Sequence, residues 1–420
     1  MIRRPELILA LLTALNFVNY VDRTVLAAVL ARVQVDLDLT QTQGGLLATA
    51  FLVGYFALSP LFGYLGDRAR ATPDAPWKVW QTRRGLMTLG VIVWSASTIA
   101  TGHTHSFYSM IAARALVGAG EASYAAVAPT IIDDLAPPDR KGKWLSVFYL
   151  AVPVGSAIGY LLGGFVQKHY GWREAFYAAG LPGAVFALLC LLIAEPNRAA
   201  AARALSLRAS LAPLLKERVY ARAVAGYCLF TFALGGFAHW APKYIHHQYK
   251  TDLDKANYAF GLILVAGGII GTGIGGAWGD RAAKRATTSG EAAGDHPGAR
   301  AHLRVCAVAS ALGAPFAAAC FLSPTSTAFF SLIFVAIVAL FLTTSPINAA
   351  LLSSVPAGVR GSAMALSIFA IHLFGDLWSP PLVGLIADHA PMQLAMLLLP
   401  AAIALSALAW WLPRTPRAAA

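Results

Sequence analysis

The sequence carries little charge: Asp, Glu, Lys and Arg make up 12% of its 420 residues, whereas 58% are hydrophobic. A soluble enzyme of this length would have about a quarter of its residues charged, so that class is excluded. A nucleic-acid-binding protein is excluded too, because the 32 Lys and Arg lie in small groups between long apolar runs. The composition indicates a protein that crosses a membrane several times.

Cysteine is also scarce. The four cysteines all lie in apolar stretches, where a free cysteine behaves as a small buried hydrophobe, and they outline no disulfide or metal framework. The sequence contains no recognisable ATP-binding motif, metal constellation or nucleophile arrangement. We therefore expect no cofactor, no metal and no enzymatic activity, and a transport function would draw its energy from a gradient.

Long apolar runs are what the sequence does contain. A helix needs about 20 such residues to cross a bilayer. Dividing the chain at charges, Pro and Gly predicts twelve all-α spans, at 7–31, 43–66, 85–102, 107–131, 144–167, 174–194, 219–242, 256–278, 303–322, 327–353, 361–387 and 392–412. The first run contains Asp22 and Arg23, which a cleaved signal peptide should not have, so we interpret it as a retained helix.

The basic residues predict the orientation. With an even number of spans both termini share one side, and 24 of the 32 Lys and Arg fall in segments on that side, against six on the other. Because basic loops stay in the cytoplasm, both termini are expected to be cytoplasmic.

The chain is internally doubled. GYLGDRA at 63–69 corresponds to GAWGDRA at 276–282, PPDRKGK at 137–143 to PAGVRGS at 356–362, and GGFVQKH at 163–169 to VGLIADH at 383–389, at offsets of 213 to 220 residues. Six spans per copy make these parallel repeats. The predicted domains are an N-terminal six-helix bundle at 1–194, a cytoplasmic linker at 195–218 that forms an interfacial helix, and a C-terminal bundle at 219–420.

Two six-helix halves resemble the major facilitator superfamily, and local motifs agree. The turn after 43–66 resembles that superfamily's signature Gly-x-x-x-Asp-Arg at Gly63, Asp67 and Arg68, although its basic tail is displaced by an insertion. RALVGAGEA, from Arg114, resembles a second superfamily pattern. GSAIGYLLGG at 155–164 is similar to a glycine motif common in antiporters, with Tyr160 where that motif usually has Pro, which favours antiport.

A narrower resemblance is to the Spinster family. It rests on NYVDRTVLAAVL at 19–30, RALVGAGEASYAAVAPTIIDDL at 114–135, SVFYLAVPVGSAIGYLLGG at 146–164 and HLFGDLWSPPLVG at 372–384. The resemblance implies a bacterial inner-membrane member that moves an amphiphilic lipid, such as a lysophospholipid or sphingosine 1-phosphate, by alternating access. Its expected partners are that substrate, protons and membrane lipids, and it is expected to be a monomer.

Five ionisable residues fall at membrane depth: Asp22, Arg23, Arg114, Glu121 and Asp376. Each costs roughly 2.5–3.5 kcal/mol at mid-helix, so they are expected to face one another or a wet cavity. Arg114 and Glu121 are seven residues apart and share one helix face. The superfamily fold lines its first cavity with the spans that carry Asp22 and Glu121, so the resemblance implies one network of the first four charges.

We hypothesise that Asp22 and Glu121 exchange protons and arginine partners during transport, because a buried carboxylate that loses an arginine holds its proton more tightly. The alternative is a static ion-pair cluster that fixes packing. Arg23 and Arg114 are predicted to bind the substrate head group, since the guanidinium fork suits phosphate. His372 and Asp376 are either a second proton site or, in the preferred reading, Asp376 caps backbone donors freed at Pro380 and Pro381.

Two further groups complete the predicted site. Gly63, Asp67 and Arg68 are expected to form an inner gate in which Gly63 permits close helix approach and Asp67 latches onto a helix N-terminus; the alternative is a solvated Asp67. Candidate cavity-wall residues, any of which could instead serve packing, are Phe51, Tyr55, Tyr124, Tyr149, Phe230, Phe237, Trp240, Thr344 and Asn348. His239 and Trp240 are also candidates for an outer gate.

Other functions remain open on the sequence alone. A proton-coupled exporter of drugs or organic anions would show the same fold and charges. A lipid scramblase, or a sensor that binds its ligand without moving it, belongs to a different class. Trans-stimulation by unlabelled substrate distinguishes a carrier from both.

Overall fold

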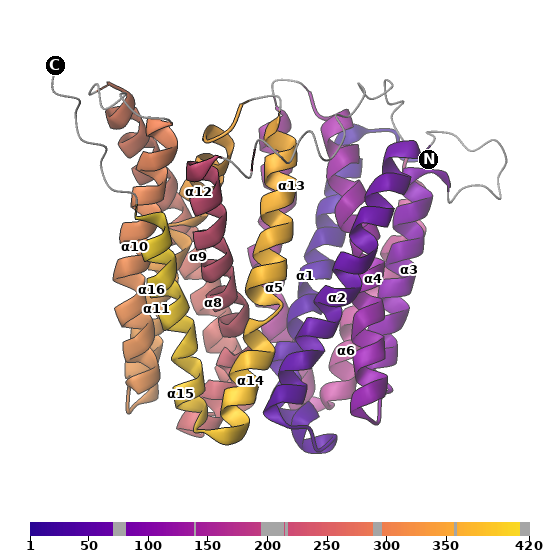
Figure 1. Ribbon diagram of the computed structural model, residues 1–420. Helices are drawn as coiled ribbons and strands as arrows, with labels where there is room; N and C mark the ends of the chain where they lie inside the picture. The colour runs from indigo at the N-terminus through magenta and orange to yellow at the C-terminus, as the bar shows by residue number, and fades with distance from the viewer. Residues whose placement is uncertain are drawn as a thin grey trace. The chain divides into compact units, whose positions relative to one another are not determined.

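The computed structural model describes residues 1–69, 81–137, 140–194, 214, 217–288, 296–356 and 359–411. Within these residues the chain is helical throughout its length (Figure 1). Its elements are α1 (Pro5–Asp36), α2 (Gln41–Arg68), α3 (Arg83–Gly102), α4 (Phe107–Leu135), α5 (Lys141–His169), α6 (Trp172–Cys190), α8 (Arg218–Tyr249), α9 (Leu253–Thr288), α10 (Pro297–Leu322), α11 (Ser326–Phe341), α12 (Thr344–Ser353), α13 (Arg360–Ile371), η4 (His372–Asp376), α14 (Ser379–His389), α15 (Met392–Met396) and α16 (Leu398–Trp410).

All twelve expected spans are helical, which confirms the all-α membrane fold. Ten segments of the described chain are long and apolar enough to cross a membrane, and α1 and α6 correspond to the other two expected spans. Three spans are composite: α11 is followed by α12, α13 by η4 and α14, and α15 by α16. Several helices extend past the expected limits, α9 by ten residues to Thr288, because a helix continues into polar turns outside the apolar layer.

Short polar motifs fix where helices begin. Thr40 and Gln43 form a capping box at α2, in which the Gln43 N–H donates to Thr40 Oγ1 at 3.1 Å and the Thr40 N–H donates to Gln43 Oε1 at 3.0 Å. Ser106 and Ser109 do the same at α4. Such caps satisfy the backbone donors that a helix start leaves unpaired, so each turn between spans has a definite end.

The chain forms two compact units. Unit 1 contains Met1–Ala202 and Ile245–Gly261, and unit 2 contains Arg203–Tyr244 and Leu262–Ala420. The segment Ile245–Gly261 falls in the expected C-terminal bundle by sequence yet packs in unit 1. There Asn257 Nδ2 donates to Ala28 O at 2.9 Å, and Lys168 pairs with Asp254 at 2.8 Å. The interfacial helix expected over 195–218 lies almost entirely outside the described residues.

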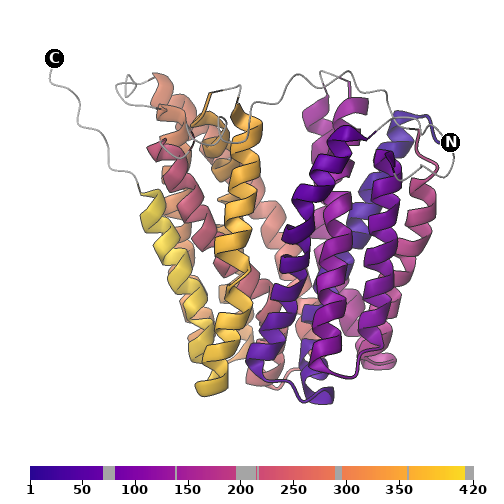
Figure 2. The same cartoon turned by 45° about the vertical axis from the view of Figure 1, so that its right-hand side comes forward.

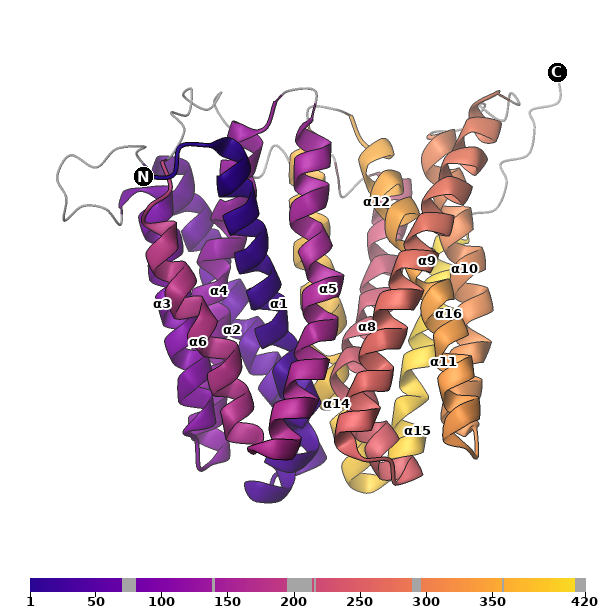
Figure 3. The ribbon, with the colours of Figure 1, turned by 180° about the vertical axis from the view of Figure 1, so that it is seen from behind.

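Within unit 1, the main neighbours of α1 are α5 and α6, α4 lies between α2 and α3, and α3 packs on α6 (Figure 3). The chain's first residues are tied to the end of α6, where Ile2 forms an isolated parallel bridge with Ile193. Within unit 2, α10 packs against α11, α12 and α16. In that unit α13, η4 and α14 follow one another as a single bent helical span (Figure 2).

Candidate functional site

The centre of unit 1 contains an ion pair between α1 and α4. Arg23 Nε lies 2.7 Å from Glu121 Oε2, and the Glu121 side chain is completely buried. Aromatic rings surround the guanidinium of Arg23, whose Cζ lies 5.0 Å from the ring centroids of Tyr20 and Phe51 and 5.2 Å from that of Tyr55. The rings favour the cation, so the ion pair sits in a largely aromatic shell.

Asp22 is next to Arg23 in sequence but faces another helix. Successive residues of an α-helix point about 100° apart, so Asp22 turns toward α3 while Arg23 turns toward α4. The indole N–H of Trp94 and the hydroxyl of Thr98 both donate to Asp22 Oδ2, the second at 2.5 Å. Asp22 is fully buried, and its other oxygen, Oδ1, has no hydrogen-bond partner among the described residues.

Arg114 on α4 is 2% exposed and forms no ion pair within 4 Å in the described part of the chain. Its Cζ lies 5.4 Å from the Phe51 ring centroid. It interacts electrostatically with Asp22 and Glu121, although its Nε and Nη1 have no hydrogen-bond partner among the described residues. A buried cation in this state is costly unless a partner completes it.

The close approach of α4 to its neighbours depends on glycine. A side chain at Gly118 would overlap the backbone of Phe51 and Tyr55 on α2, and one at Gly120 would overlap the backbone of Trp94 on α3. Only hydrogen fits at these two contacts, so α4 can bring Arg114 and Glu121 against both helices. The RALVGAGEA pattern therefore positions the site as well as supplying two of its charges.

The four charges expected in one network do lie together in unit 1, but the two carboxylates bind different groups. Arg23 pairs with Glu121, whereas Asp22 is bound by Trp94 and Thr98. Sequence reasoning missed these two α3 residues. The available signal was their spacing: an indole and a hydroxyl four residues apart share one face of the helix.

The expected cavity-wall residues fall into two groups. Phe51 and Tyr55 lie against Arg23, Tyr149 is exposed, and Thr344 and Asn348 are half-buried. The other four are buried inside their helical bundles: Tyr124 donates to Leu12 O at 2.7 Å, Phe230 packs on Trp410, Phe237 stacks on Phe321, and Trp240 donates to Pro380 O at 3.0 Å. Large aromatics at helical spacing fill helix interfaces more readily than they line a cavity. His239 is buried beside Trp240.

In unit 2, His372 and Asp376 form a second pair. The Nδ1 atom of His372 lies 3.0 and 2.9 Å from the two carboxylate oxygens of Asp376, and the residues begin and end the π-helical turn η4. Such turns occur often at functional sites. The expected capping role of Asp376 is not what the structure shows. Within the described chain its carboxylate hydrogen-bonds to His372 and accepts from no backbone N–H. Pro380 instead lies in the first turn of α14, where a missing N–H costs nothing.

The predicted inner gate is only partly described. A side chain at Gly63 would meet no described atom within 4 Å, so this glycine makes no close approach here. The side chains of Asp67 and Arg68 lie outside the described residues. After the insertion, Arg83 pairs with Asp134 of α4 at 2.6 Å, and Arg84 donates to Ile193 O at 3.1 Å near the end of α6.

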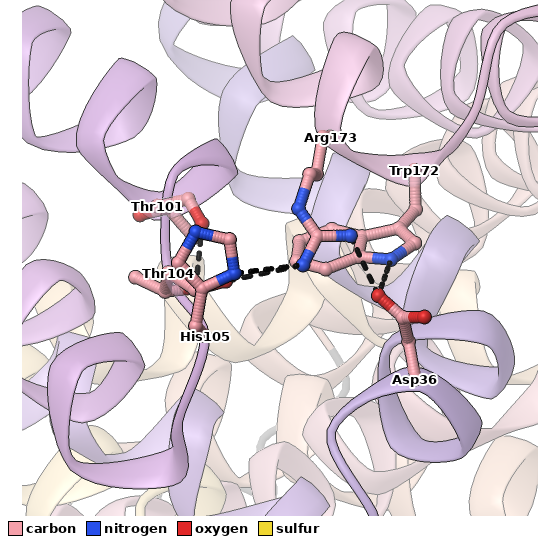
Figure 4. A network of polar contacts seen from close by, with 6 residues as sticks. All are labelled: Asp36, Thr101, Thr104, His105, Trp172 and Arg173. Atoms are coloured by element: carbon pink, nitrogen blue, oxygen red, sulfur yellow. Dashed lines mark hydrogen bonds and ion pairs between the residues drawn. The ribbon is translucent and has the colours of Figure 1, made fainter.

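At the other end of unit 1 a polar cluster joins the end of α1, the turn between α3 and α4, and the start of α6 (Figure 4). Arg173 lies between Asp36, to which its Nη1 donates at 2.6 Å, and His105, whose Nδ1 accepts from Nη2 at 3.4 Å. The Trp172 indole also donates to Asp36, at 3.0 Å. These two donors, Arg173 above all, lower the pKa of Asp36, which lies beyond the expected span 7–31.

Comparison with known proteins agrees with this architecture. Residues 12–375 match the family model of the Major Facilitator Superfamily. The structure superposes on that of a bacterial homologue of the human lysosomal transporter Spinster, in its inward-facing and unoccupied conformation, with a TM-score of 0.77 over 97% of this chain and 94% of that one. The two sequences are 19% identical, so this likeness concerns the fold.

Sequence relatives give a narrower result. The probable sphingolipid transporter spinster homolog 2 of Arabidopsis thaliana is 31% identical, over 92% of this chain and 81% of its own length. Protein spinster homolog 1 of Homo sapiens is 32% identical, over 92% of this chain and 74% of its own length. The chain is a multi-pass membrane protein that belongs to the Spinster family of major facilitator superfamily transporters.

Proposed function

We propose that this protein is a secondary active transporter that moves an amphiphilic lipid across the membrane by alternating access, in exchange for protons. The substrate class would be a single-chain lipid with an anionic head, such as a lysophospholipid or sphingosine 1-phosphate. Two relatives from Arabidopsis thaliana, described as probable sphingolipid transporters, support this class. We also propose the cytoplasmic termini, the two-bundle division and a monomeric state expected from the sequence.

The observation that carries the proposal is the incomplete state of Arg114. Its buried Nε and Nη1 have no hydrogen-bond partner among the described residues, and its guanidinium lies beside the Phe51 ring. A phosphate would supply the missing acceptors and would match the planar donor fork, while aromatic surroundings suit an acyl chain. Arg23, whose side chain is 21% exposed, would be the second head-group contact.

Proton exchange is supported by unpaired acceptors in the same place. Asp22 Oδ1 and Glu121 Oε1 are buried and have no hydrogen-bond partner in the described chain. Two carboxylates with one unpaired oxygen each, beside an arginine whose Nε and Nη1 are unpaired among the described residues, provide the groups that such an exchange of partners requires. In a carrier with two conformations, such an exchange couples proton binding to the change of state. The static ion-pair reading predicts instead that neutral variants keep proton coupling.

Two other sites belong to the proposal. His372 and Asp376 would be a second proton site, supported by their bidentate contact at the π turn. Asp67 would latch the inner gate while the substrate cavity opens outward, a role that rests on the sequence motif. Crosslinking across the inner gate tests the latch: the crosslink yield should fall in Asp67→Asn and stay unchanged in Asp36→Asn.

Reconstitution in liposomes tests the function as a whole. Labelled sphingosine 1-phosphate, an anionic lysophospholipid, a cationic drug and a small organic anion are added outside in separate assays, and a trapped dye reports internal pH. We expect uptake stimulated by unlabelled substrate inside, with a pH change that is lost in Asp22→Asn and Glu121→Gln and kept in the surface control Asp252→Asn. Uptake without trans-stimulation indicates a scramblase, binding without uptake a sensor, and selective uptake of drugs or organic anions an exporter of that class. Each of these results would overturn the lipid carrier.

A further inference from the structure

Trp94 and Thr98 are buried polar residues of α3 that the proposed transport cycle leaves unused. Both donate to the same oxygen of Asp22, Oδ2, from positions one helical turn apart. Trp94 is fully buried, as is Thr98, so no water competes for these bonds. Two donors on one carboxylate oxygen and none on the other is an asymmetric arrangement, and it determines where a proton can bind.

The chemistry of the donors makes the choice. An indole N–H only donates, whereas a threonine hydroxyl can donate or accept. With Trp94 and Thr98 both donating to Oδ2, a proton on that oxygen would require Thr98 to turn its hydroxyl round. Oδ1 meets no such donor among the described residues. Protonation therefore forms the O–H bond at Oδ1, the carboxylate charge is neutralised, and Oδ2 becomes the carbonyl oxygen that still accepts from Trp94 and Thr98.

We infer that Trp94 and Thr98 are positioning residues for proton exchange: they hold Asp22 in one rotamer, assign its proton to Oδ1 and stabilise its ionised form through Oδ2. The inference rests on the proposed function, in which Asp22 binds the transported proton. It gives α3 a role in proton exchange, which the proposed function assigns only to charged residues of α1 and α4. Hydrogen bonds to the charged form of an acid set the pH at which the acid releases its proton.

The charged groups around Asp22 are few. Arg23 is its neighbour on α1, and Arg114 and Glu121 come from α4. On the side of α5, the described residues that face α1 near this depth include Gly155 and Gly159, which carry no side chain. On α6, Gly180 and Gly183 pack on α3 near this depth, while Arg173 and Glu174 lie at the helix start and Tyr177 packs on His103.

The test observes Asp22 itself. In purified full-length protein, the infrared band of the protonated carboxyl group that disappears in Asp22→Asn is followed as a function of pH. We expect Thr98→Val and Trp94→Phe each to move the midpoint of this titration about one unit toward higher pH, because one donor to the ionised form is lost. Thr98→Ser, which keeps the hydroxyl, should restore the wild-type midpoint.

Matched controls lie in the same structure. Thr101→Val removes a buried hydroxyl one turn further along α3, where it donates to Ser97 O at 2.8 Å, and Trp410→Phe removes a buried indole N–H that donates to Ala223 O at 3.1 Å. Neither should move the midpoint. An unchanged midpoint in Thr98→Val, an equal shift in Thr101→Val, or no titrating Asp22 band at all would overturn the inference.

Failure of the proposed function gives a different result. If Asp22 titrates as expected while liposome transport proceeds without any pH change, proton-coupled transport is wrong and the positioning of Asp22 stands. If Trp94→Phe does not fold, the Thr98→Val and Thr98→Ser pair decides the question by itself.

Discussion

Arg23 of α1 and Glu121 of α4 form an ion pair with an Nε–Oε2 distance of 2.7 Å, and its two members differ in exposure. The Arg23 side chain is 21% exposed, whereas that of Glu121 is fully buried. Loss of Arg23 therefore leaves a fully buried carboxylate, while loss of Glu121 leaves a cation whose side chain is partly exposed and packs against three aromatic rings. Substitution of Arg23 and substitution of Glu121 should therefore lower the free energy of unfolding by different amounts.

We expect Arg23→Ala to lower the free energy of unfolding by about 3 kcal/mol, the range for stranding a buried charge, and Glu121→Gln by about 1 kcal/mol. Thermal unfolding in detergent measures both. The double variant should be more stable than Arg23→Ala alone, because it contains no stranded carboxylate. Equal losses in the two single variants would contradict the asymmetry.

Arg114→Lys should weaken binding of an anionic amphiphile roughly tenfold. Lysine retains the charge but lacks the planar fork whose free Nε and Nη1 are proposed to bind the head group. The half-saturation concentration for liposome uptake reports the effect. Arg173→Lys, which changes an arginine at the end of unit 1, is the control and should leave it unchanged. A normal value in Arg114→Lys would exclude bidentate head-group binding.

Gly118→Ala should destabilise the protein by about 1–3 kcal/mol, since the added methyl group overlaps the backbone of Phe51 and Tyr55. It should also reduce transport, because separation of α2 from α4 moves the rings that surround Arg23. Gly63→Ala is the matched control on α2, where a methyl group meets no described atom within 4 Å. Thermal unfolding of the two variants, measured side by side, checks the prediction; similar melting temperatures would refute it.

Asp376→Asn should fold normally and lower the number of protons moved per substrate. The side chains of His372 and Asp376 are 25% and 19% exposed, and pairs near a surface contribute less than about 1 kcal/mol to stability. Protein yield, melting temperature and the pH change per transported substrate are the readouts. A large loss of yield with unchanged stoichiometry would favour a structural role for the pair.

The Asp36–Arg173 contact gives a pH prediction outside the membrane. Arg173 lowers the pKa of Asp36 below its ordinary value of 3.8, so the contact stabilises the folded state above that pH and is lost as pH falls through the folded pKa. Arg173→Gln should cost less than about 1 kcal/mol at neutral pH, because Asp36 is 48% exposed. Its melting temperature should approach that of wild type in acid below 3.8 and also in high salt. A difference that persists in acid would contradict the assignment.

The arrangement around Asp22 shows the limit of sequence reasoning. The pattern identified Asp22, Arg23, Arg114 and Glu121 as membrane-depth charges, and the resemblance to the superfamily implied that they form one network. It could not divide them into partners. Which oxygen meets which donor depends on how α1 lies against α3 and α4, and these two helices approach each other closely at Gly120 and Trp94.

Aromatic residues also show that the sequence does not determine which neighbour a side chain contacts. Phe237 and Trp240 occupy positions that a helical pattern allows to face either a cavity or a neighbouring helix. The structure places Phe237 on Phe321 and directs the Trp240 indole N–H to Pro380 O. Periodicity specifies a residue's direction on its own helix, whereas its neighbour is set by how helices distant in the chain pack.

The sequence by itself therefore determined the membrane class, the twelve spans, the doubled chain and the presence of buried charges, because these follow from composition, spacing and the energetics of the bilayer. Only the tertiary structure decided that Arg23 pairs with Glu121, that Asp22 accepts from Trp94 and Thr98, and that Nε and Nη1 of Arg114 have no hydrogen-bond partner among the described residues. These are contacts between residues 72 to 98 positions apart or absences of contact, and only the packed arrangement of helices defines them.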